Sequence, residues 1–412
     1  MNVAVVNLGC KVNRVESDTI AAAYLSNGSR ITDIEHADLI VVNTCTVTEE
    51  AEKKTRKTIR RVLHHNSSAP VLVTGCAATI NPDYYRNLSD RISIVDKHEL
   101  LSQELHGIET LEEHPLLRIG KDFPTRVGVK VQDGCNHSCT YCIVHIARGK
   151  AWSRPCKLIV DEIVQLAKNG VKEIVLSGID LGSYNYTLKE KKMRLADLLN
   201  EILAKLDENH LDDVRLRVSS IEPCSIQDDF IELLAHSKGR ICRHLHLPLQ
   251  SGSSRVLKEM NRPYSSEYYL NLSTKLKEKI PGISLTTDII VGFPGETDDD
   301  FNKTYSLAKQ VGFSKIHVFR YSKRQGTPAA ERQDQITPEI KEQRAHSLLA
   351  LSDSLRQKYA ETNKSRKENV VVEQLGWGMS ESYYKIKVDQ AIKPGTVLQE
   401  TLSNCIELEK EC

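Results

Sequence analysis

Three closely spaced cysteines could share one metal centre. Cys135, Cys139 and Cys142 form the pattern C-x3-C-x2-C in GCNHSCTYCIVHIARG, just after an apolar, β-branched run. A structural zinc site is normally closed by a fourth ligand at a short spacing, which His137 or His145 could supply. Three thiolates on an iron–sulfur cluster instead leave one iron open to an outside ligand. The spacing therefore favours a catalytic iron–sulfur cluster, with zinc as the alternative.

A second set of cysteines is spread over the first part of the chain. Cys10, Cys45 and Cys76 each follow a short apolar run, in VAVVNLGC, ADLIVVNTC and PVLVTGC. The spacings fit one strand–helix unit each, and such units form a parallel, doubly wound sheet that binds ligands beyond the carboxyl ends of its strands. Taken singly, each would be an ordinary buried thiol. Because all three end successive strands, we expect them to converge on a second metal site.

Composition limits the kind of protein that can hold these cysteines. The chain has 412 residues, a formal charge of +1, 27% charged residues and 40% hydrophobic residues, which predicts a globular protein of two or three domains. It has no apolar run of the ~18 residues that a bilayer span needs, and MNVAVVNLGC has no basic start typical of a signal peptide. We therefore expect a cytoplasmic protein without a membrane partner. Eleven cysteines in a reducing compartment favour metal or thiol chemistry over disulfides.

A turn-rich stretch around Pro115 to Pro124 precedes a second series of strand and helix patterns. Six units of strand and helix predict a partial (β/α)6 barrel, because a complete barrel of this kind takes eight. Its active site would lie at the carboxyl ends of the strands, next to Cys135, Cys139 and Cys142. The strand-like runs are Val127–Gln132, Glu173–Leu176, Arg215–Val218, His244–Leu247, Ile283–Val291 and Ile316–Tyr321.

The last part of the chain has a different pattern. A long helix from about Pro338 to Glu361 is followed by short strands at Val370–Glu373, Tyr383–Val388 and Thr396–Leu402, separated by glycines. This pattern predicts a small antiparallel β-barrel, too small for an enzyme. The fold class is α/β with this added β module, and the predicted domains are 1–115, 125–355 and 364–412.

The C-x3-C-x2-C pattern, with the aromatic Tyr141 before its last cysteine, resembles the signature of the radical S-adenosylmethionine (SAM) enzymes. The resemblance implies a [4Fe-4S] cluster on Cys135, Cys139 and Cys142 whose open iron binds the amino and carboxylate groups of SAM. One electron from the cluster then cleaves SAM to a 5′-deoxyadenosyl radical, which abstracts a hydrogen atom. A cellular electron donor is implied as a partner.

A flavodoxin-like domain with Cys10, Cys45 and Cys76, placed ahead of such a barrel, resembles the methylthiotransferases of this superfamily. The resemblance implies a second, auxiliary [4Fe-4S] cluster on these cysteines, whose open iron presents the sulfur or methylthio group. Five cysteines have no role in this interpretation: Cys156, Cys224, Cys242, Cys405 and Cys412.

The short sequence motifs around the cysteines are similar to those of one branch of these enzymes. LGCKVNRVES, NTCTVTEEAEKKTR and VTGCAA, with RVSSIEP, HLHLPLQSGS, TDIIVGFPGE and YSKRQGTPAA, resemble the tRNA threonylcarbamoyladenosine branch. After Cys10 the chain has Lys11, Val12 and Asn13, where the dimethylallyl-adenosine branch has Gln-Met-Asn and the ribosomal-protein branch Pro-Lys-Asn. The branch implies methylthiolation at C2 of N6-threonylcarbamoyladenosine next to the tRNA anticodon, using two SAM.

Alternatives remain open at this point. The same chemistry could act on dimethylallyl-adenosine tRNA or on a ribosomal-protein aspartate. A protein of another class, a zinc-stabilised RNA-binding protein without redox chemistry, would also use clustered Cys and His with a small terminal β-barrel.

The family implies SAM contacts at several strand ends. Gly178 and Asp180 occupy the turn that meets the methionine amino group, where a carboxylate would make a charge-assisted hydrogen bond. Ser219 and Gln250 end later strands, where ribose and carboxylate contacts are expected, although a capping role fits as well.

Four further residues are candidates for contact with the same cofactor or with substrate. Gly292 and Glu296 in VGFPGE shape the adenine end, or only form the turn before a helix. Arg148 and Arg154, after the cluster loop, could hold the SAM carboxylate or a substrate phosphate through two parallel hydrogen bonds.

A chain of near-zero net charge must bind RNA through local patches. Lys323 and Arg324 form one small patch, and the C-terminal module resembles the RNA-binding TRAM domain. Residues 364–412 carry seven Lys/Arg against eight Asp/Glu, so binding driven by bulk charge is not expected there. The module could instead recognise RNA by shape, by base stacking on Trp377, Tyr383 or Tyr384, or through a few basic side chains. A larger basic patch follows Cys45, at Lys53, Lys54, Arg56, Lys57, Arg60 and Arg61.

Overall fold

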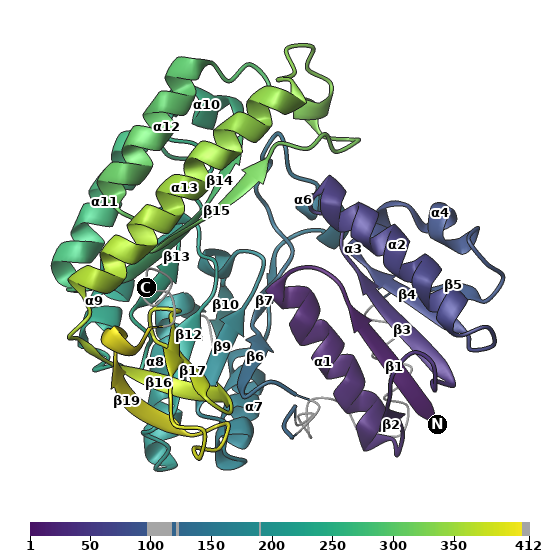
Figure 1. Ribbon diagram of the computed structural model, residues 1–412. Helices are drawn as coiled ribbons and strands as arrows, with labels where there is room; N and C mark the ends of the chain where they lie inside the picture. The colour runs from purple at the N-terminus through teal and green to yellow at the C-terminus, as the bar shows by residue number, and fades with distance from the viewer. Residues whose placement is uncertain (97–117, 121–122, 189–190, 406–412) are drawn as a thin grey trace.

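A computed structural model describes residues 1–96, 118–120, 123–188 and 191–405 of the chain. Half of the turn-rich stretch predicted around Pro115 to Pro124 lies outside the described residues, as does Cys412. Figure 1 shows an N-terminal α/β part, a central part of parallel strands with helices around them, and a C-terminal antiparallel sheet. No helix in the described ranges is long and apolar enough to cross a bilayer.

Residues 1–96 form one parallel sheet with the strand order β2-β1-β3-β4-β5. This is the order of flavodoxin-like sheets, as expected from the strand–helix spacing. The strands read as continuous apolar runs because helices cover the sheet. The elements are β1 (Asn2–Asn7), α1 (Lys11–Ser26), β2 (Arg30–Ile31), β3 (Leu39–Thr44), α2 (Glu49–His65), β4 (Val71–Gly75), α3 (Cys76–Ile80), α4 (Pro82–Arg86) and β5 (Ile92–Ile94).

All six strands predicted for the central part are present, each within one or two residues of its predicted bounds. They form two parallel sheets, β12-β9-β6 and β13-β14-β15, joined by the isolated bridges Leu216↔Ile241 and Ser220↔His246. The result is an incomplete barrel of parallel strands, as the sequence predicts. The strands are β6 (Arg126–Lys130), β9 (Glu173–Ser177), β12 (Arg215–Val218), β13 (His244–His246), β14 (Ser284–Val291) and β15 (Lys315–Arg320).

Helices surround these strands, and short elements complete the connections (Figure 1). The helices are α6 (Val144–Arg148), α7 (Cys156–Lys168), α8 (Leu195–Glu208), α9 (Asp228–His236), α10 (Ser254–Glu259), α11 (Ser266–Lys279), α12 (Asp298–Val311) and α13 (Pro338–Thr362). The short strands are β7 (Gln132–Asp133), β8 (Trp152–Ser153), β10 (Tyr186–Leu188) and β11 (Lys191–Met193).

Side chains alternate between two environments along the barrel strands, because successive residues of a strand point to opposite faces. Ile174 and Leu216 pack in the apolar core with Ile163 of α7. Glu173 and Arg217, one position along their strands, belong instead to a fully buried ionic group. The barrel therefore has an apolar outer core and a polar interior.

Helix α1 of the N-terminal part covers the free edge of the incomplete barrel at β6. A Cβ atom added to Gly128 in β6 would lie 2.3 Å from Cγ2 of Val15 in α1, so only glycine permits this approach. The segment that carries Cys10 is thereby packed against the strand that precedes the C-x3-C-x2-C loop.

The C-terminal part is a four-stranded antiparallel sheet with the order β18-β17-β16-β19. Its strands are β16 (Lys367–Gln374), β17 (Trp377–Ser380), β18 (Lys385–Lys387) and β19 (Val397–Thr401). Strand β17 was not predicted, because its glycine resembles a turn signal. A Cβ atom added to Gly378 would lie 2.6 Å from Cγ1 of Val370, so the glycine allows close strand packing. Closure of this sheet into a barrel remains a prediction.

Two aromatic residues expected to stack on RNA bases pack against other side chains of the protein instead. The ring of Tyr383 lies 4.1 Å from the Arg217 guanidinium, inside the barrel. Tyr384 is 0% exposed and its ring stacks on Tyr359 at 5.5 Å. Trp377 and Tyr383 are each partly exposed, whereas Tyr384 is buried. The contacts of the two tyrosines anchor the C-terminal sheet to the barrel.

Candidate functional site

The structure brings Cys10, Cys45 and Cys76 together beyond the carboxyl ends of β1, β3 and β4. Cys45 and Cys76 are buried and Cys10 is exposed. Burial, and to a lesser extent the neighbouring thiols of Cys10 and Cys76, raise the pKa of the Cys45 thiol to about 11. Burial also raises the pKa of Cys76, with Cys10 adding to the shift. The three thiols therefore share one electrostatic neighbourhood.

Local hydrogen bonds hold the loops of this triplet in place. The Asn13 amide donates to the carbonyl oxygens of Leu8 at 2.9 Å and Thr44 at 2.8 Å, which joins the loops that carry Cys10 and Cys45. Gly75, directly before Cys76, has φ +89°, and a Cβ atom there would lie 2.6 Å from the Thr44 carbonyl oxygen. A glycine at this position lets the end of β4 approach the end of β3.

The second triplet lies on the loop between β7 and α6, at the carboxyl end of the first barrel strand. The backbone N–H of His137 donates to Sγ of Cys135 at 3.4 Å, and that of Val144 donates to Sγ of Cys142 at 3.4 Å. Burial, with smaller contributions from the neighbouring thiols, raises the pKa of Cys135 to about 11 and that of Cys142 to about 12. Metal binding must therefore displace protons from these thiols.

The two triplets fit [4Fe-4S] clusters by their donor atoms. Each offers three soft sulfur ligands, and N–H groups at the second triplet already point at sulfur, as they do around protein-bound iron–sulfur clusters. Within the described ranges, no three His, Cys, Asp or Glu side chains are arranged to hold a single metal ion. A cubane cluster needs one thiolate at each of three separate irons, so its ligands lie farther apart than those of a single metal ion.

Two oxygen atoms near the second triplet are buried without a hydrogen-bond partner: Oδ1 of Asp180 and Oγ of Ser219. The other carboxylate oxygen of Asp180 lies 3.1 Å from Nε2 of His137. The backbone N–H of Asp180 donates to Oε1 of Gln132 at 2.9 Å. Leaving a buried acceptor unpaired costs free energy. An ammonium or hydroxyl group of a ligand would satisfy these oxygen atoms, as the proposed contacts to SAM require.

Replacing Asp180 with Asn should weaken SAM binding about 10- to 100-fold, because a hydrogen bond to a charged group contributes roughly 1.5–3 kcal/mol. Equilibrium dialysis of SAM with the anaerobically reconstituted protein measures this change. Asp228→Asn is the matched control, since Asp228 is exposed and paired with Lys275. Equal SAM affinities of the two variants would contradict a contact between Asp180 and SAM.

Four other predicted SAM contacts lie at strand ends. A Cβ atom added to Gly178 would meet Oε1 of Gln132 at 2.9 Å, so the glycine allows a close turn. Gln250 is buried with φ +63°. Oε2 of Glu296 accepts hydrogen bonds from the Gly292 N–H at 2.7 Å and from Arg344 at 2.6 Å. Glu296 was expected either to shape the adenine end of the SAM site or to form the turn before a helix. These hydrogen bonds support the second role.

Arg262 contacts the second triplet, although no sequence motif marked it. Its guanidinium donates to Sγ of Cys139 at 3.2 Å and to Glu222 at 2.6 Å. Tyr141, the aromatic residue of the signature, packs against a buried apolar cluster that includes Phe293 and Met260. The sequence separation of 123 residues between Arg262 and Cys139 explains why spacing could not reveal this contact.

Both arginines assigned to SAM or phosphate are occupied by protein partners. Arg154 donates to the Lys130 carbonyl at 2.7 Å and to Glu162 of α7 at 2.8 Å. Arg148 crosses from the cluster loop to the N-terminal part and donates to Asn13 at 2.6 Å and to Glu16 at 3.0 Å. The guanidinium of Arg148 therefore joins the two halves of the site.

A second connection between the two halves follows β15. Arg324, expected to contact RNA, is 6% exposed and donates to the Thr46 carbonyl and to Glu52 of α2. The Glu49 N–H donates to Oγ of Ser322 at 3.2 Å. The prediction for Arg324 is therefore wrong, since its charge is used to hold the loop after Cys45, whereas Lys323 is exposed.

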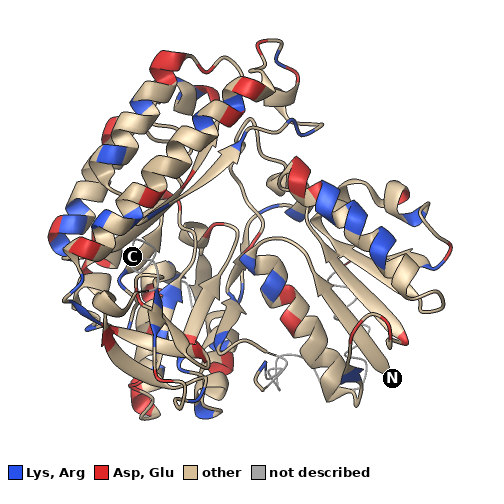
Figure 2. Cartoon of the chain, viewed as in Figure 1, with Lys and Arg blue, Asp and Glu red and all other residues tan. Residues whose placement is uncertain are grey.

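The basic residues of α2 lie mostly on its exposed face, next to the first triplet (Figure 2). Lys53 pairs with Glu49 at 2.7 Å and Arg56 pairs with Glu52 at 2.9 Å, both one helical turn away. Exposed pairs of this kind contribute little to stability, so their charges remain available to a polyanion.

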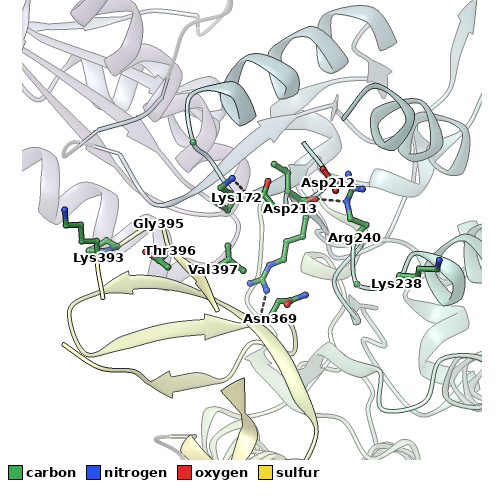
Figure 3. A pocket seen from close by; sticks show the side chains of 15 residues that line it. Lys172, Asp212, Asp213, Lys238, Arg240, Asn369, Lys393, Gly395, Thr396 and Val397 are labelled. Carbon is green, nitrogen blue, oxygen red and sulfur yellow. Dashed lines mark hydrogen bonds and ion pairs between the residues drawn. The ribbon is translucent and has the colours of Figure 1, made fainter. Parts of the chain in front are cut away.

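A cavity of about 780 Å³ lies at the opposite end of the barrel, between the start of β9 and the C-terminal sheet. Figure 3 shows Lys172 beside Asp213 on one wall and Lys393 to Val397 on the other. Its lining includes none of the cysteines. The cavity is thus separate from the site described above.

Comparison with known proteins gives two family matches that divide at the same place as the fold. Residues 129–308 match the Radical SAM superfamily, and residues 2–96 match Uncharacterized protein family UPF0004. The two cysteine triplets fall one in each matched region. The fold, the matches and the cluster loop define a radical SAM enzyme, a class that uses a [4Fe-4S] cluster and SAM.

Curated relatives specify the family further. The Bacillus subtilis protein named threonylcarbamoyladenosine tRNA methylthiotransferase MtaB is 40% identical over 389 residues, which cover 90% of this chain and 84% of the relative. The Carboxydothermus hydrogenoformans protein named tRNA-2-methylthio-N(6)-dimethylallyladenosine synthase is 38% identical, covering 89% of this chain and 86% of the relative. The chain belongs to the radical SAM tRNA methylthiotransferases, and it is a tRNA-modifying transferase.

Solved structures agree on the fold. The radical SAM methyltransferase TsrM from Kitasatospora setae, with cobalamin and a [4Fe-4S] cluster bound, aligns with a TM-score of 0.55 at 16% identity, covering 80% of this chain and 77% of that one. The radical SAM enzyme OxsB aligns at 0.52 and 11% identity, covering 87% of this chain and 56% of that one. At these identities the likeness concerns architecture alone.

Proposed function

We propose that this enzyme converts N6-threonylcarbamoyladenosine, next to the tRNA anticodon, to its 2-methylthio derivative. The observation that carries the proposal is the 40% identity to a relative named for that nucleoside, together with Lys11, Val12 and Asn13 after Cys10. Membership of a tRNA-modifying family favours tRNA over a ribosomal protein and sets aside a zinc-stabilised protein without redox chemistry.

Two [4Fe-4S] clusters would be held by the two triplets. Cys135, Cys139 and Cys142 would hold the one that supplies the electron for SAM cleavage. Cys10, Cys45 and Cys76 would hold the auxiliary one. The Arg148 and Arg324 contacts support this arrangement, because they bind the loops of the auxiliary site to the carboxyl end of the barrel.

The chain's own residues have three tasks in this reaction. Asp180 and Ser219 would orient SAM through their unpaired oxygen atoms, and Arg262 would support the cluster loop from the side of Cys139. The basic face of α2 would hold the phosphates of an anticodon stem-loop. Extruding an unpaired base of such a loop into the active site costs less free energy than extruding a paired base of a duplex.

The proposed division of the chain is 1–115 for the auxiliary-cluster domain, 125–355 for the barrel and 364–412 for a TRAM-like module. The separate sheets of the three parts support this division. In the last part, the partly exposed Trp377 is an aromatic side chain on which a base could stack, and Lys385 lies 4.9 Å from its ring. An electron donor from the cell would complete the system.

Deletion of the gene should remove 2-methylthio-N6-threonylcarbamoyladenosine from cellular tRNA and leave the unmodified threonylcarbamoyl nucleoside in its place. Mass spectrometry of nucleosides from the deletion strain and the complemented strain measures both. Complementation with the Cys45→Ala chain is the matched negative control. Persistence of the methylthio group on the threonylcarbamoyl nucleoside, with its loss from dimethylallyl-adenosine, would instead support the second candidate substrate.

That second substrate has its own support in the 38% identity to a relative named for the dimethylallyl nucleoside. The two nucleosides differ chemically, because the threonylcarbamoyl group carries a carboxylate and the dimethylallyl group is apolar. Assays of the reconstituted enzyme on tRNA that carries only one of the two modifications separate them directly.

A further inference from the structure

Arg148 is a buried charge at the boundary between the two cysteine triplets. It ends α6, shortly after Cys142, and its side chain is 2% exposed. Its guanidinium donates to Asn13 at 2.6 Å, to Asp133 at 2.9 Å and to Glu16 at 3.0 Å. Arg148 is thus held by groups from both the N-terminal part and the barrel.

The same guanidinium lies beside the thiols of the auxiliary site. Cys76 is within hydrogen-bonding reach of Arg148, and the arginine charge acts against the effect of burial at both Cys76 and Cys45. Helices α3, which starts at Cys76, and α6, which ends at Arg148, pack against each other. A cation from the radical SAM loop therefore faces the metal ligands of the other domain.

The surrounding charges balance this cation. Lys130 contacts both Glu16 and Asp133 at 3.1 Å, so two cations and two carboxylates form one buried group. Removing one charged member of such a group leaves an uncompensated charge in a site of low dielectric. Without Arg148, the group would present a net negative charge to the auxiliary thiolates.

We propose that Arg148 is a positioning residue of the auxiliary cluster, which holds Asn13 in the first turn of α1 and stabilises the cluster's reduced state through its charge and a hydrogen bond to sulfur. This inference rests on the proposed function, since it takes the second cluster as present. The physical reason is that one-electron reduction adds negative charge, which a nearby buried cation stabilises. Hydrogen bonds to cluster sulfurs act in the same direction.

The test uses the full chain with Cys135→Ala, Cys139→Ala and Cys142→Ala, so that only the auxiliary cluster remains. In this background, Arg148→Gln, Arg148→Lys and the control Arg14→Gln are reconstituted anaerobically. Arg14 lies on the same helix as Glu16, but its side chain is 51% exposed and pairs with Asp18. Redox titration followed by electron paramagnetic resonance gives the midpoint potential of each variant, and iron analysis gives the cluster content.

Arg148→Gln should lower the equilibrium constant for reduction at least tenfold, which is about 59 mV for one electron. Arg148→Lys keeps the charge and should stay within about threefold of the parent, as should Arg14→Gln. If Arg148→Gln takes up no cluster, restoration of cluster content by Arg148→Lys supports the role of the charge, and failure of Arg148→Lys overturns it.

Two other outcomes are decisive. A cluster whose potential is the same with Arg and Gln at position 148 overturns this inference alone. A background chain that binds no iron overturns the proposed auxiliary cluster, and the role of Arg148 with it.

Discussion

A chain with alanine at Cys135, Cys139 and Cys142 should lose all reductive cleavage of SAM and keep about four of about eight irons, because only one [4Fe-4S] site remains. The converse chain, with alanine at Cys10, Cys45 and Cys76, should also keep about four irons. This second chain should still cleave SAM, since its C-x3-C-x2-C loop is intact, but should add no methylthio group to tRNA. Iron analysis, 5′-deoxyadenosine release and nucleoside mass spectrometry measure the three properties.

The control for these chains is Cys156→Ala. Cys156 starts α7 and is 3% exposed in the apolar core of the barrel, away from both triplets. Its replacement should leave about eight irons per chain in place, with both activities intact. Equal loss of SAM cleavage in the two triplet variants would contradict the division of roles between the sites.

Glu173→Ala should lower the free energy of unfolding by about 3–5 kcal/mol, since removal of one partner leaves buried charges without compensation. Glu173 is 0% exposed and pairs with Arg217 at 2.6 Å and Arg215 at 2.5 Å. Burial alone would raise the pKa of Glu173, but the nearby arginines outweigh it and hold that pKa well below its usual range. The carboxylate is therefore charged in the folded protein at neutral pH.

The same arginines join the barrel to the C-terminal sheet, so the effect of Glu173→Ala should extend there. Arg217 donates to the carbonyl oxygens of Glu381 at 2.6 Å and Ser380 at 3.0 Å. Chemical denaturation of the metal-free chain measures the stability, and limited proteolysis reports on the C-terminal sheet. The control Asp161→Asn breaks an exposed pair with Lys157 and should cost only about 0.3–0.5 kcal/mol. Similar losses for both variants would show that the Glu173 group is not required for stability.

Local patterns were sufficient for much of the fold. The six barrel strands, the three strands that end near Cys10, Cys45 and Cys76, and the long helix Pro338–Thr362 all agree with the sequence analysis within a few residues. Apolar periodicity and the carboxyl-end rule for parallel sheets depend on neighbouring residues and on chirality, and both can be read from a short segment.

Contacts between distant segments could not be read in this way. The sequence suggested that Arg148, Arg154 and Arg324 bind cofactor, substrate or RNA, because a cation near a loop is usually a ligand candidate. The structure instead pairs each one with a carboxylate from another element. Whether a guanidinium is free depends on what the fold places opposite it, and that partner can be more than a hundred residues away.

Residue type and short-range spacing were thus enough to predict the two trios of thiols, their separate sheets and the type of chemistry. The side chains that surround the thiols became known only from the folded structure. Arg262 at Cys139, Arg148 near Cys76 and α1 against β6 all result from packing between parts of the chain that have no local relation. Buried charges must find partners wherever the fold brings them, and that requirement has no signature in sequence spacing.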